Sequence, residues 1–107
     1  MFANTPEPPY YAVIFTSQIS GNMDGYADMA DKIGKLAATM PGFLGMESVR
    51  GAEGVGITVA YYDSLEAIDG WRKNADHMEA KGMGREMWYD GYRLRIAKVE
   101  TAKAFDR

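Results

Sequence analysis

The middle of the chain reads PGFLGMESVRGAEGVGITVAYYDS over residues 41–64. Its opening Pro-Gly is typical of the end of a helix. The glycine-containing turn at 51–54 separates two runs rich in β-branched and aromatic residues, which predicts a hairpin with strands at 43–50 and 55–62. Its closing Asp-Ser, followed by Leu-Glu, is close to a capping box and predicts the start of another helix. This stretch therefore predicts the order helix, strand, strand, helix.

The segments on either side complete the pattern. Residues 10–19 are rich in aromatic and β-branched side chains and contain no Gly or Pro, which predicts a strand. Apolar residues recur at helical spacing from Tyr26 to Met40, with Asp24 as the expected N-cap. Residues 92–101 predict the last strand. The order β-α-β-β-α-β predicts an α+β, ferredoxin-like fold, in which a four-stranded antiparallel sheet carries both helices on one face.

The second helical region is predicted to contain a break. An apolar stripe that ends at Trp71 predicts a short helix. Asn74 is expected to interrupt this helix and to cap a further helical segment over residues 75–88. Gly82 and Gly84 weaken that segment by about 1 kcal/mol each relative to Ala.

The length of 107 residues fits one compact domain. Pro6, Pro8 and Pro9 favour an extended N-terminal arm over residues 1–9, because proline fixes φ and restricts the residue before it. We therefore expect one ferredoxin-like domain over residues 10–107. No linker composition or internal repeat indicates a second one.

Composition excludes several classes of function. The 12 Lys and Arg against 15 Asp and Glu give a net charge of −3, and no basic run indicates a nucleic-acid partner. Because the chain has no Cys and one His, disulfides, zinc–thiolate sites and multi-histidine metal sites are not expected within one chain. No stretch approaches the ~20 apolar residues of a membrane span, and the N-terminus lacks a signal-peptide pattern. We expect a soluble, cytoplasmic protein.

The predicted strands at 10–19 and 55–62 carry apolar residues on both faces. A sheet with one solvated face alternates more cleanly between apolar and polar residues. The simplest cover for the helix-free face is the sheet of a twofold-related copy. We therefore expect a homodimer formed through the sheet.

Several segments together resemble the antibiotic biosynthesis monooxygenase family, over about residues 10–100. They are PGFLG at 41–45, VAYYDS at 59–64 and WRKNADH at 71–77. GREMWY at 84–89 and the basic strand YRLRI at 92–96 resemble a bacterial subgroup of uncharacterised members. The resemblance implies a dimeric α+β barrel, a fold that hosts many activities.

The resemblance leaves three kinds of function open. Some relatives oxygenate polyphenols or quinols with dioxygen and neither metal nor flavin, one branch binds and degrades haem, and many members have no demonstrated activity. We expect a cofactor-independent monooxygenase for a small hydroxylated aromatic or quinol, with no cofactor and no metal. The alternative from a different class is a non-enzymatic, small-ligand-binding or stress-related protein.

The haem-degrading alternative fits the sequence less well. The pattern of that branch has an Asn on the first strand, a Trp on the second helix and a later His. Trp71 matches, but the first strand offers only Ser17 or Gln18 as a substitute for the Asn. His77 follows Trp71 too closely to be the later ligand.

His77 is the expected catalytic base, because it is the only imidazole in the chain. At the start of a segment capped by Asn74, the positive end of the helix dipole would keep it neutral and able to accept a phenolic proton. The alternative is a structural hydrogen bond at the helix break.

The expected substrate-binding residues form an aromatic pocket with one cation: Trp71, Tyr61, Trp88, Phe15 and Arg72. An aromatic wall stacks against a flat substrate, and an arginine can hold a phenolate. Each of these residues also has a structural alternative, as core filling for the aromatic side chains and as a surface contact for the arginine. Because successive residues alternate across a strand, Tyr61 and Tyr62 point to opposite faces.

Overall fold

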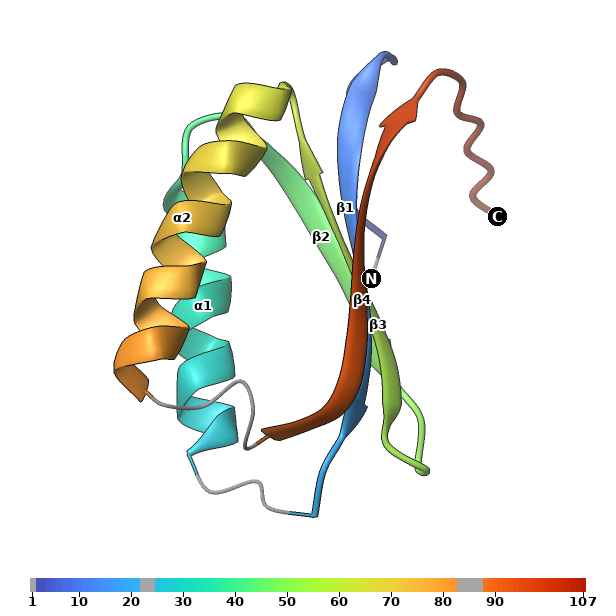
Figure 1. The fold of residues 1–107 in the computed structure, drawn as a ribbon. Coiled ribbons are helices and arrows are strands. Elements are labelled where there is room, and N and C mark those ends of the chain that lie inside the picture. Colours follow the sequence, from blue (N-terminus) through green and yellow to red (C-terminus); the bar gives the residue numbers. More distant parts are fainter. Residues whose placement is uncertain (1, 22–24, 83–87) are drawn as a thin grey trace.

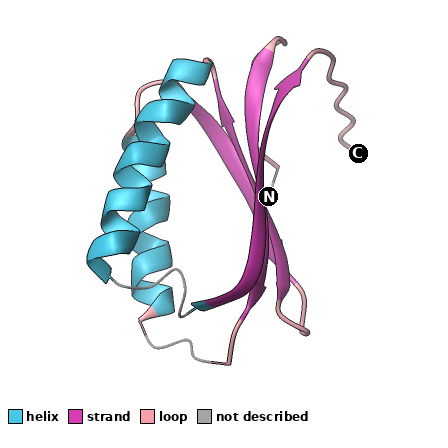
Figure 2. Ribbon diagram, in the orientation of Figure 1, coloured by secondary structure: helices cyan, strands magenta, loops and turns pink. Residues whose placement is uncertain are grey.

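The computed structural model describes residues 2–21, 25–82 and 88–107, with residues 75–82 described by their backbone only. The described elements are β1 (Tyr10–Ile19), α1 (Tyr26–Thr39), β2 (Phe43–Arg50), β3 (Val55–Tyr62), α2 (Leu65–Gly82) and β4 (Tyr89–Val99). The strands form one antiparallel sheet in the order β2-β3-β1-β4. Both helices cover the same face of this sheet (Figures 1 and 2). The predicted α+β, ferredoxin-like fold is confirmed.

The connections around the central hairpin follow the residues that predicted them. Gly42 has φ +86°, a left-handed conformation that glycine adopts without strain, and its carbonyl accepts a hydrogen bond from the Asp63 N–H at 2.9 Å. The Ser64 Oγ accepts a hydrogen bond from the Ala67 N–H at 3.1 Å, which caps the start of α2. The two ends of the hairpin are therefore joined to each other, and the second end leads directly into the capped start of α2.

Two predicted helix features are wrong. α2 runs unbroken from Leu65 to Gly82, so Asn74 does not end a helix. Its Nδ2 instead donates to the Gly70 carbonyl at 3.0 Å, one turn back, and this bond leaves the helix intact. The N-cap of α1 is Gly25, whereas the predicted cap Asp24 lies outside the described residues.

The core fills one end of the space between helices and sheet. Val13, Ala60, Tyr62 and Ile68 form its buried cluster, and Tyr62 is fully buried. Partly buried apolar side chains pack against this cluster, among them Trp71. Helix–sheet packing is thus concentrated where α2 begins, and a cavity in the same interlayer space adjoins this cluster, since Val13 and Ala60 also line it.

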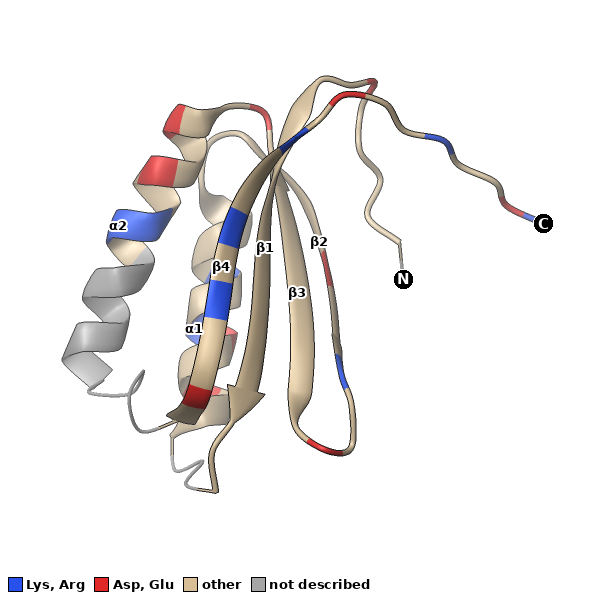
Figure 3. Cartoon of the chain, turned by 45° about the vertical axis from the view of Figure 1, so that its right-hand side comes forward, with Lys and Arg blue, Asp and Glu red and all other residues tan. Residues whose placement is uncertain are grey.

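The other face of the sheet has no helix over it (Figure 1). Val49, Val55 and Ile57 are exposed there by 70%, 48% and 43%. The N-terminal arm lies at one end of this face, where the Ala3 N–H donates to Glu47 Oε2 at 3.0 Å. β4 contributes a basic stripe at the edge of the sheet, and its Arg93 and Arg95 are exposed (Figure 3). Among the described residues, no helix is long and apolar enough to cross a membrane.

Candidate functional site

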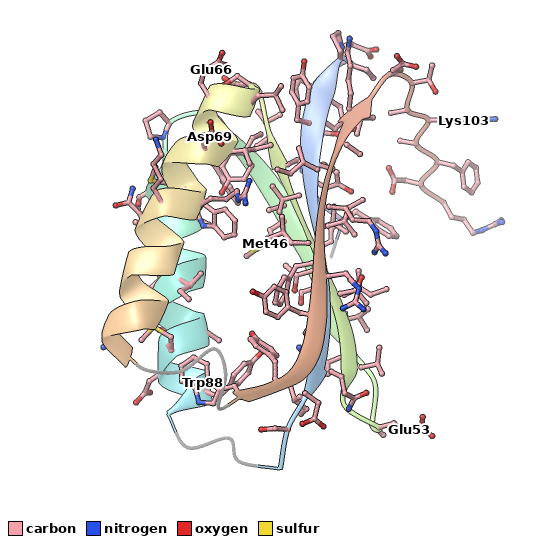
Figure 4. The ribbon with its side chains drawn as sticks, in the orientation of Figure 1. Met46, Glu53, Glu66, Asp69, Trp88 and Lys103 are labelled. Atoms are coloured by element: carbon pink, nitrogen blue, oxygen red, sulfur yellow. The ribbon has the colours of Figure 1, made fainter. Side chains whose placement is uncertain are left out.

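A cavity of about 360 Å³ lies between the helix layer and the inner face of the sheet. All four strands and both helices contribute to its walls. The helix side is mostly small or aliphatic, with Ala30, Ile33, Gly34 and Ala37 from α1. Met46 points from β2 towards this helix side (Figure 4), and its Cε lies 4.0 Å from the place where a Cβ would stand at Gly34. The small residues of α1 therefore leave room for the cavity.

Three of the five predicted substrate-binding residues line this cavity: Trp71, Phe15 and Arg72. Trp88 does not line it, and its side chain is buried to 4% exposure at the lower end of α1 (Figure 4). Its ring packs edge-to-face against Tyr26 at a centroid distance of 5.6 Å. Trp88 thus supports a wall residue of the cavity.

Tyr61 lies on the helix-free face, away from the cavity. Its hydroxyl donates to Glu47 Oε1 at 2.9 Å, and its ring meets Tyr10 edge-to-face at 5.7 Å. Burial, the hydrogen bond to Glu47 and the charge of that carboxylate raise the Tyr61 pKa to about 12. Its neighbour Tyr62 points into the core, as alternation along the strand predicts.

Trp71 joins the core to the cavity. Its ring lies 6.3 Å from that of Tyr62, and burial raises the Tyr62 pKa to about 12. The Trp71 Nε1 and the Tyr62 hydroxyl are buried, and neither has a hydrogen-bond partner among the described residues. Because a buried N–H without a partner costs free energy, a ligand oxygen that accepted a hydrogen bond from this N–H would recover that cost.

An aromatic cluster forms the wall on the β1–β4 side. Phe15 lies 5.5 Å from Tyr89 and 5.2 Å from Tyr92, and Tyr26 of α1 lies 6.0 Å from Tyr89. These tilted and edge-to-face arrangements are the favourable geometries for aromatic pairs. The cluster offers flat apolar surface with phenol groups at its edges, which suits an aromatic ligand.

Arg50 is a cavity residue that the sequence interpretation missed. It is the last residue of β2 and pairs with Gly56 in the sheet register. Its Nη2 donates to the Ser17 Oγ at 2.8 Å. A glycine inside a predicted strand often marks a close approach, so Gly56 was the available sequence feature.

His77 lies within α2, and its side chain is outside the described part of the structure. Because α2 is unbroken, His77 is not in the first turn of a helix, and the helix-dipole argument for a neutral imidazole does not apply. Six residues make about 1.7 turns, so positions 71 and 77 fall on different sides of a regular helix. The role of His77 therefore stays a prediction from composition.

The sequence model of the antibiotic biosynthesis monooxygenases matches residues 9–82. The chain belongs to this family. It is 53% identical over 103 residues to the uncharacterized protein YqjZ of Bacillus subtilis, which covers 96% of the chain and 90% of that protein. This relative carries no stated activity.

Several solved structures share the fold of this chain at low sequence identity. SnoaB from Streptomyces nogalater, described as a cofactor-independent oxygenase, has a TM-score of 0.63 at 8% identity, covering 94% of this chain and 100% of SnoaB. A protein of unknown function from Nitrosomonas europaea has a TM-score of 0.70 at 9% identity, covering 95% of this chain and 100% of its own. At such identity these likenesses show the fold and leave the reaction open.

The described residues hold no group of three or more His, Cys, Asp or Glu that could bind a metal ion. Gln18, a substitute considered for the haem-branch Asn, donates from its amide to the Glu53 carbonyl at 3.0 Å. Ser17, the other substitute, is 3% exposed and accepts a hydrogen bond from Arg50. Both side chains are thus engaged within the chain.

Proposed function

We propose that this chain is a cofactor-independent monooxygenase for a small hydroxylated aromatic or quinol. The observation that carries the proposal is the cavity of about 360 Å³ walled by Phe15, Trp71, Tyr89 and Tyr92. Membership in the monooxygenase family and the shared fold of a cofactor-independent oxygenase support it.

The proposed reaction takes a quinol and dioxygen to a hydroxyquinone and water. A phenolic O–H loses its proton, and the electron-rich ring carbon forms a bond to one oxygen atom of dioxygen. The O–O bond of the resulting peroxide then breaks, so that one oxygen stays on the ring and the other leaves as water. The quinol supplies all four electrons and both hydrogens of the water, so the balance needs no further reductant.

The cavity walls favour the anionic form of such a substrate. Arg50 and Arg72 are the cationic side chains among the described lining residues, and Tyr26, Ser48 and Thr58 add hydroxyl groups. Positive charge and fixed donors near a phenol lower its pKa, because they stabilise the phenolate. The aromatic walls displace water from the reacting ring, which protects a peroxide from side reactions.

His77 is our proposed proton acceptor. The described lining of the cavity contains no carboxylate and no imidazole. The support for His77 is therefore that it is the only imidazole of the chain.

Oxygen consumption with a panel of substituted hydroquinones tests the proposal. Catalase and superoxide dismutase are added to separate turnover from autoxidation, and ¹⁸O₂ shows whether one labelled atom enters the product. We expect uptake that depends on the protein and falls at least about tenfold in Trp71→Leu, with Lys32→Met, an exposed substitution on α1, as the matched control. Uptake that remains at the autoxidation rate with every quinol would overturn the proposal. Unchanged turnover in His77→Ala would contradict the proposed proton-acceptor role of His77 and leave the proposed reaction standing.

A non-enzymatic binding protein is the second candidate. The described lining of the cavity contains neither a carboxylate nor an imidazole, which favours this candidate, since such a cavity can hold an aromatic ligand without transforming it. Saturable binding of a quinol that is recovered unchanged under oxygen would support this alternative.

We also propose that the working unit is a homodimer formed through the helix-free face. The support is the row of exposed apolar side chains on that face, Val49, Val55 and Ile57. Exposed apolar patches of this kind are typical of interfaces between copies.

A further inference from the structure

We infer that the cavity binds an aromatic carboxylic acid, with the carboxylate held by the Arg50 guanidinium and the Tyr26 hydroxyl. This inference names the substrate class of the proposed monooxygenase and rests on that proposal for its chemical outcome. Binding itself can be tested without turnover.

The first argument is the position of Arg50 in the sheet. Tyr92, Ser17, Gly56 and Arg50 are successive partners in the register, so they form one row across β4, β1, β3 and β2. A Cβ at Gly56 would lie 2.6 Å from the guanidinium carbon of Arg50. The arginine therefore lies flat across the glycine, and the missing side chain is what admits it into the cavity.

The second argument is how firmly the guanidinium is held. Nη2 donates to the Ser17 Oγ at 2.8 Å and to the Tyr26 hydroxyl at 3.5 Å, and Nη1 donates to the Gly54 and Ser17 carbonyls. These contacts join β1, the β2–β3 turn and α1. A charged group fixed in this way needs little reorganisation when a ligand binds.

The third argument is charge. All the hydrogen-bond partners of Arg50 given above are neutral oxygen atoms. Among the described residues, Lys35 forms an ion pair with Asp31 at 2.9 Å, whereas no described carboxylate pairs with Arg50. A half-buried guanidinium at a cavity wall without a counter-ion favours a ligand carboxylate, which forms short charge-assisted hydrogen bonds with arginine.

The fourth argument is the hydroxyl beside it. Because the Tyr26 oxygen accepts a hydrogen bond from Nη2, its own proton can point elsewhere. Tyr26 lines the cavity, so this proton is available to a ligand oxygen. Phe15 lies two residues along β1 from Ser17, on the same face of the sheet, and its ring lies 5.2 Å from that of Tyr92. A ring stacked on Phe15 therefore places a carboxylate substituent towards Arg50.

Isothermal titration calorimetry of the full chain with a matched pair of ligands tests the inference. We use 3,4-dihydroxybenzoate and 3,4-dihydroxybenzamide under anaerobic conditions, since these ligands differ in charge and share their shape. We expect the acid to bind at least about tenfold more tightly than the amide, the effect typical of a charge-assisted hydrogen bond. Equal affinity for the two ligands, or no measurable binding of the acid, would overturn the inference.

The variants separate ligand binding from a structural role of Arg50. Arg50→Met should abolish the preference for the acid and leave binding of the amide within about twofold, and Lys32→Met should leave both unchanged. Gly56→Ala keeps the charge but displaces the guanidinium, so it should also reduce the preference. A purely structural Arg50 predicts equal losses for acid and amide, which would contradict the inference. Each variant is accompanied by its thermal unfolding curve, and Gly56→Ala serves as the test if Arg50→Met does not fold.

Oxygen uptake distinguishes failure of the inference from failure of the proposed function. Turnover of neutral quinols without a preference for the acid would overturn the inference and leave the monooxygenase standing. A preference for the acid that depends on Arg50, without any oxygen uptake, would support the inference and favour the binding protein.

Discussion

Tyr61 donates a hydrogen bond to Glu47 at 2.9 Å on the helix-free face, and the second oxygen of the same carboxylate holds the N-terminal arm through the Ala3 N–H at 3.0 Å. One carboxylate thus joins β3, β2 and the arm. We expect Tyr61→Phe to lower the free energy of unfolding by about 1 kcal/mol at pH 7, the usual cost of such a hydrogen bond. Chemical denaturation measures the change. A loss below about 0.3 kcal/mol would show that the bond contributes little.

The same pair predicts a pH dependence. The Tyr61 pKa rises from 10.0 to about 12 in the folded chain, so the folded state holds this proton more tightly than the unfolded state. The resulting stabilisation is complete below pH 10 and is lost as the pH rises through 12. Burial also raises the Tyr62 pKa to about 12, so Tyr62 adds to the loss of stability over the same pH range. Tyr61→Phe should therefore flatten part of the loss of stability between pH 10 and 12, measured against the wild type in the same buffers.

Gly42 is one of three glycines of the central stretch with a positive φ. Its φ is +86°, and a Cβ there would lie 2.8 Å from the Ala67 Cβ. We expect Gly42→Ala to lower the free energy of unfolding by about 1–3 kcal/mol, because both the strained backbone and the contact act against it. Gly91→Ala is the matched control, since a Cβ at Gly91 meets nothing within 4 Å. Equal effects of the two substitutions would contradict this account of Gly42.

The unbroken α2 gives another stability prediction. Asn74 donates to the Gly70 carbonyl within the helix, so Asn74→Ala should change the free energy of unfolding by less than about 0.5 kcal/mol. Ser64→Ala should cost about 1 kcal/mol, because Ser64 is the N-cap that accepts the Ala67 N–H. If Asn74 capped a separate helix, the two substitutions would have similar costs, and this result would contradict a continuous α2.

The contrast between Ser64 and Asn74 shows what local sequence predicts well. Ser64 follows a predicted strand and precedes the apolar stripe of a predicted helix, so the sequence on both sides indicates that a helix begins there. Asn74 has helical sequence on both sides, so its capping preference competes with propagation of the helix, and propagation prevails. Element order and the two faces of β3 follow from periodicity and were predicted on that basis.

The candidate site was predictable only in part. Phe15, Trp71 and Arg72 were predicted to bind substrate and line the cavity, and their contact with a substrate stays a prediction. Arg50 was not predicted, because its place at the cavity comes from the register that sets it over Gly56 and beside Ser17. The strand register depends on packing between residues far apart in the sequence, and so does the distance between the helix layer and the sheet. The residue pattern of one strand carries no information on either.

The exposed apolar side chains of the helix-free face predict that two copies of the chain associate. Ile57 is 43% exposed and Val49 70% exposed on that face. We expect sedimentation at micromolar concentration to give twice the 11.9 kDa mass of one chain, and Ile57→Lys with Val49→Lys to shift it towards one chain, because each lysine charge would be buried against the partner. Lys32→Met on α1 should leave the dimer intact. A single-chain mass for the wild type would overturn the proposed dimer.

The two tryptophans provide a spectroscopic test of where an aromatic ligand binds. Trp71 lines the cavity, whereas Trp88 is buried against Tyr26 outside its lining. A ligand in the cavity should therefore quench the fluorescence of Trp71 directly and change that of Trp88 much less, because quenching by contact needs the two rings to approach.

In Trp88→Phe, which retains Trp71, 3,4-dihydroxybenzoate should quench most of the remaining fluorescence. In Trp71→Phe, the same ligand should leave the fluorescence of Trp88 nearly constant. The two variants have one tryptophan each, so the signals need no deconvolution. Stronger quenching in Trp71→Phe than in Trp88→Phe would place the ligand outside this cavity.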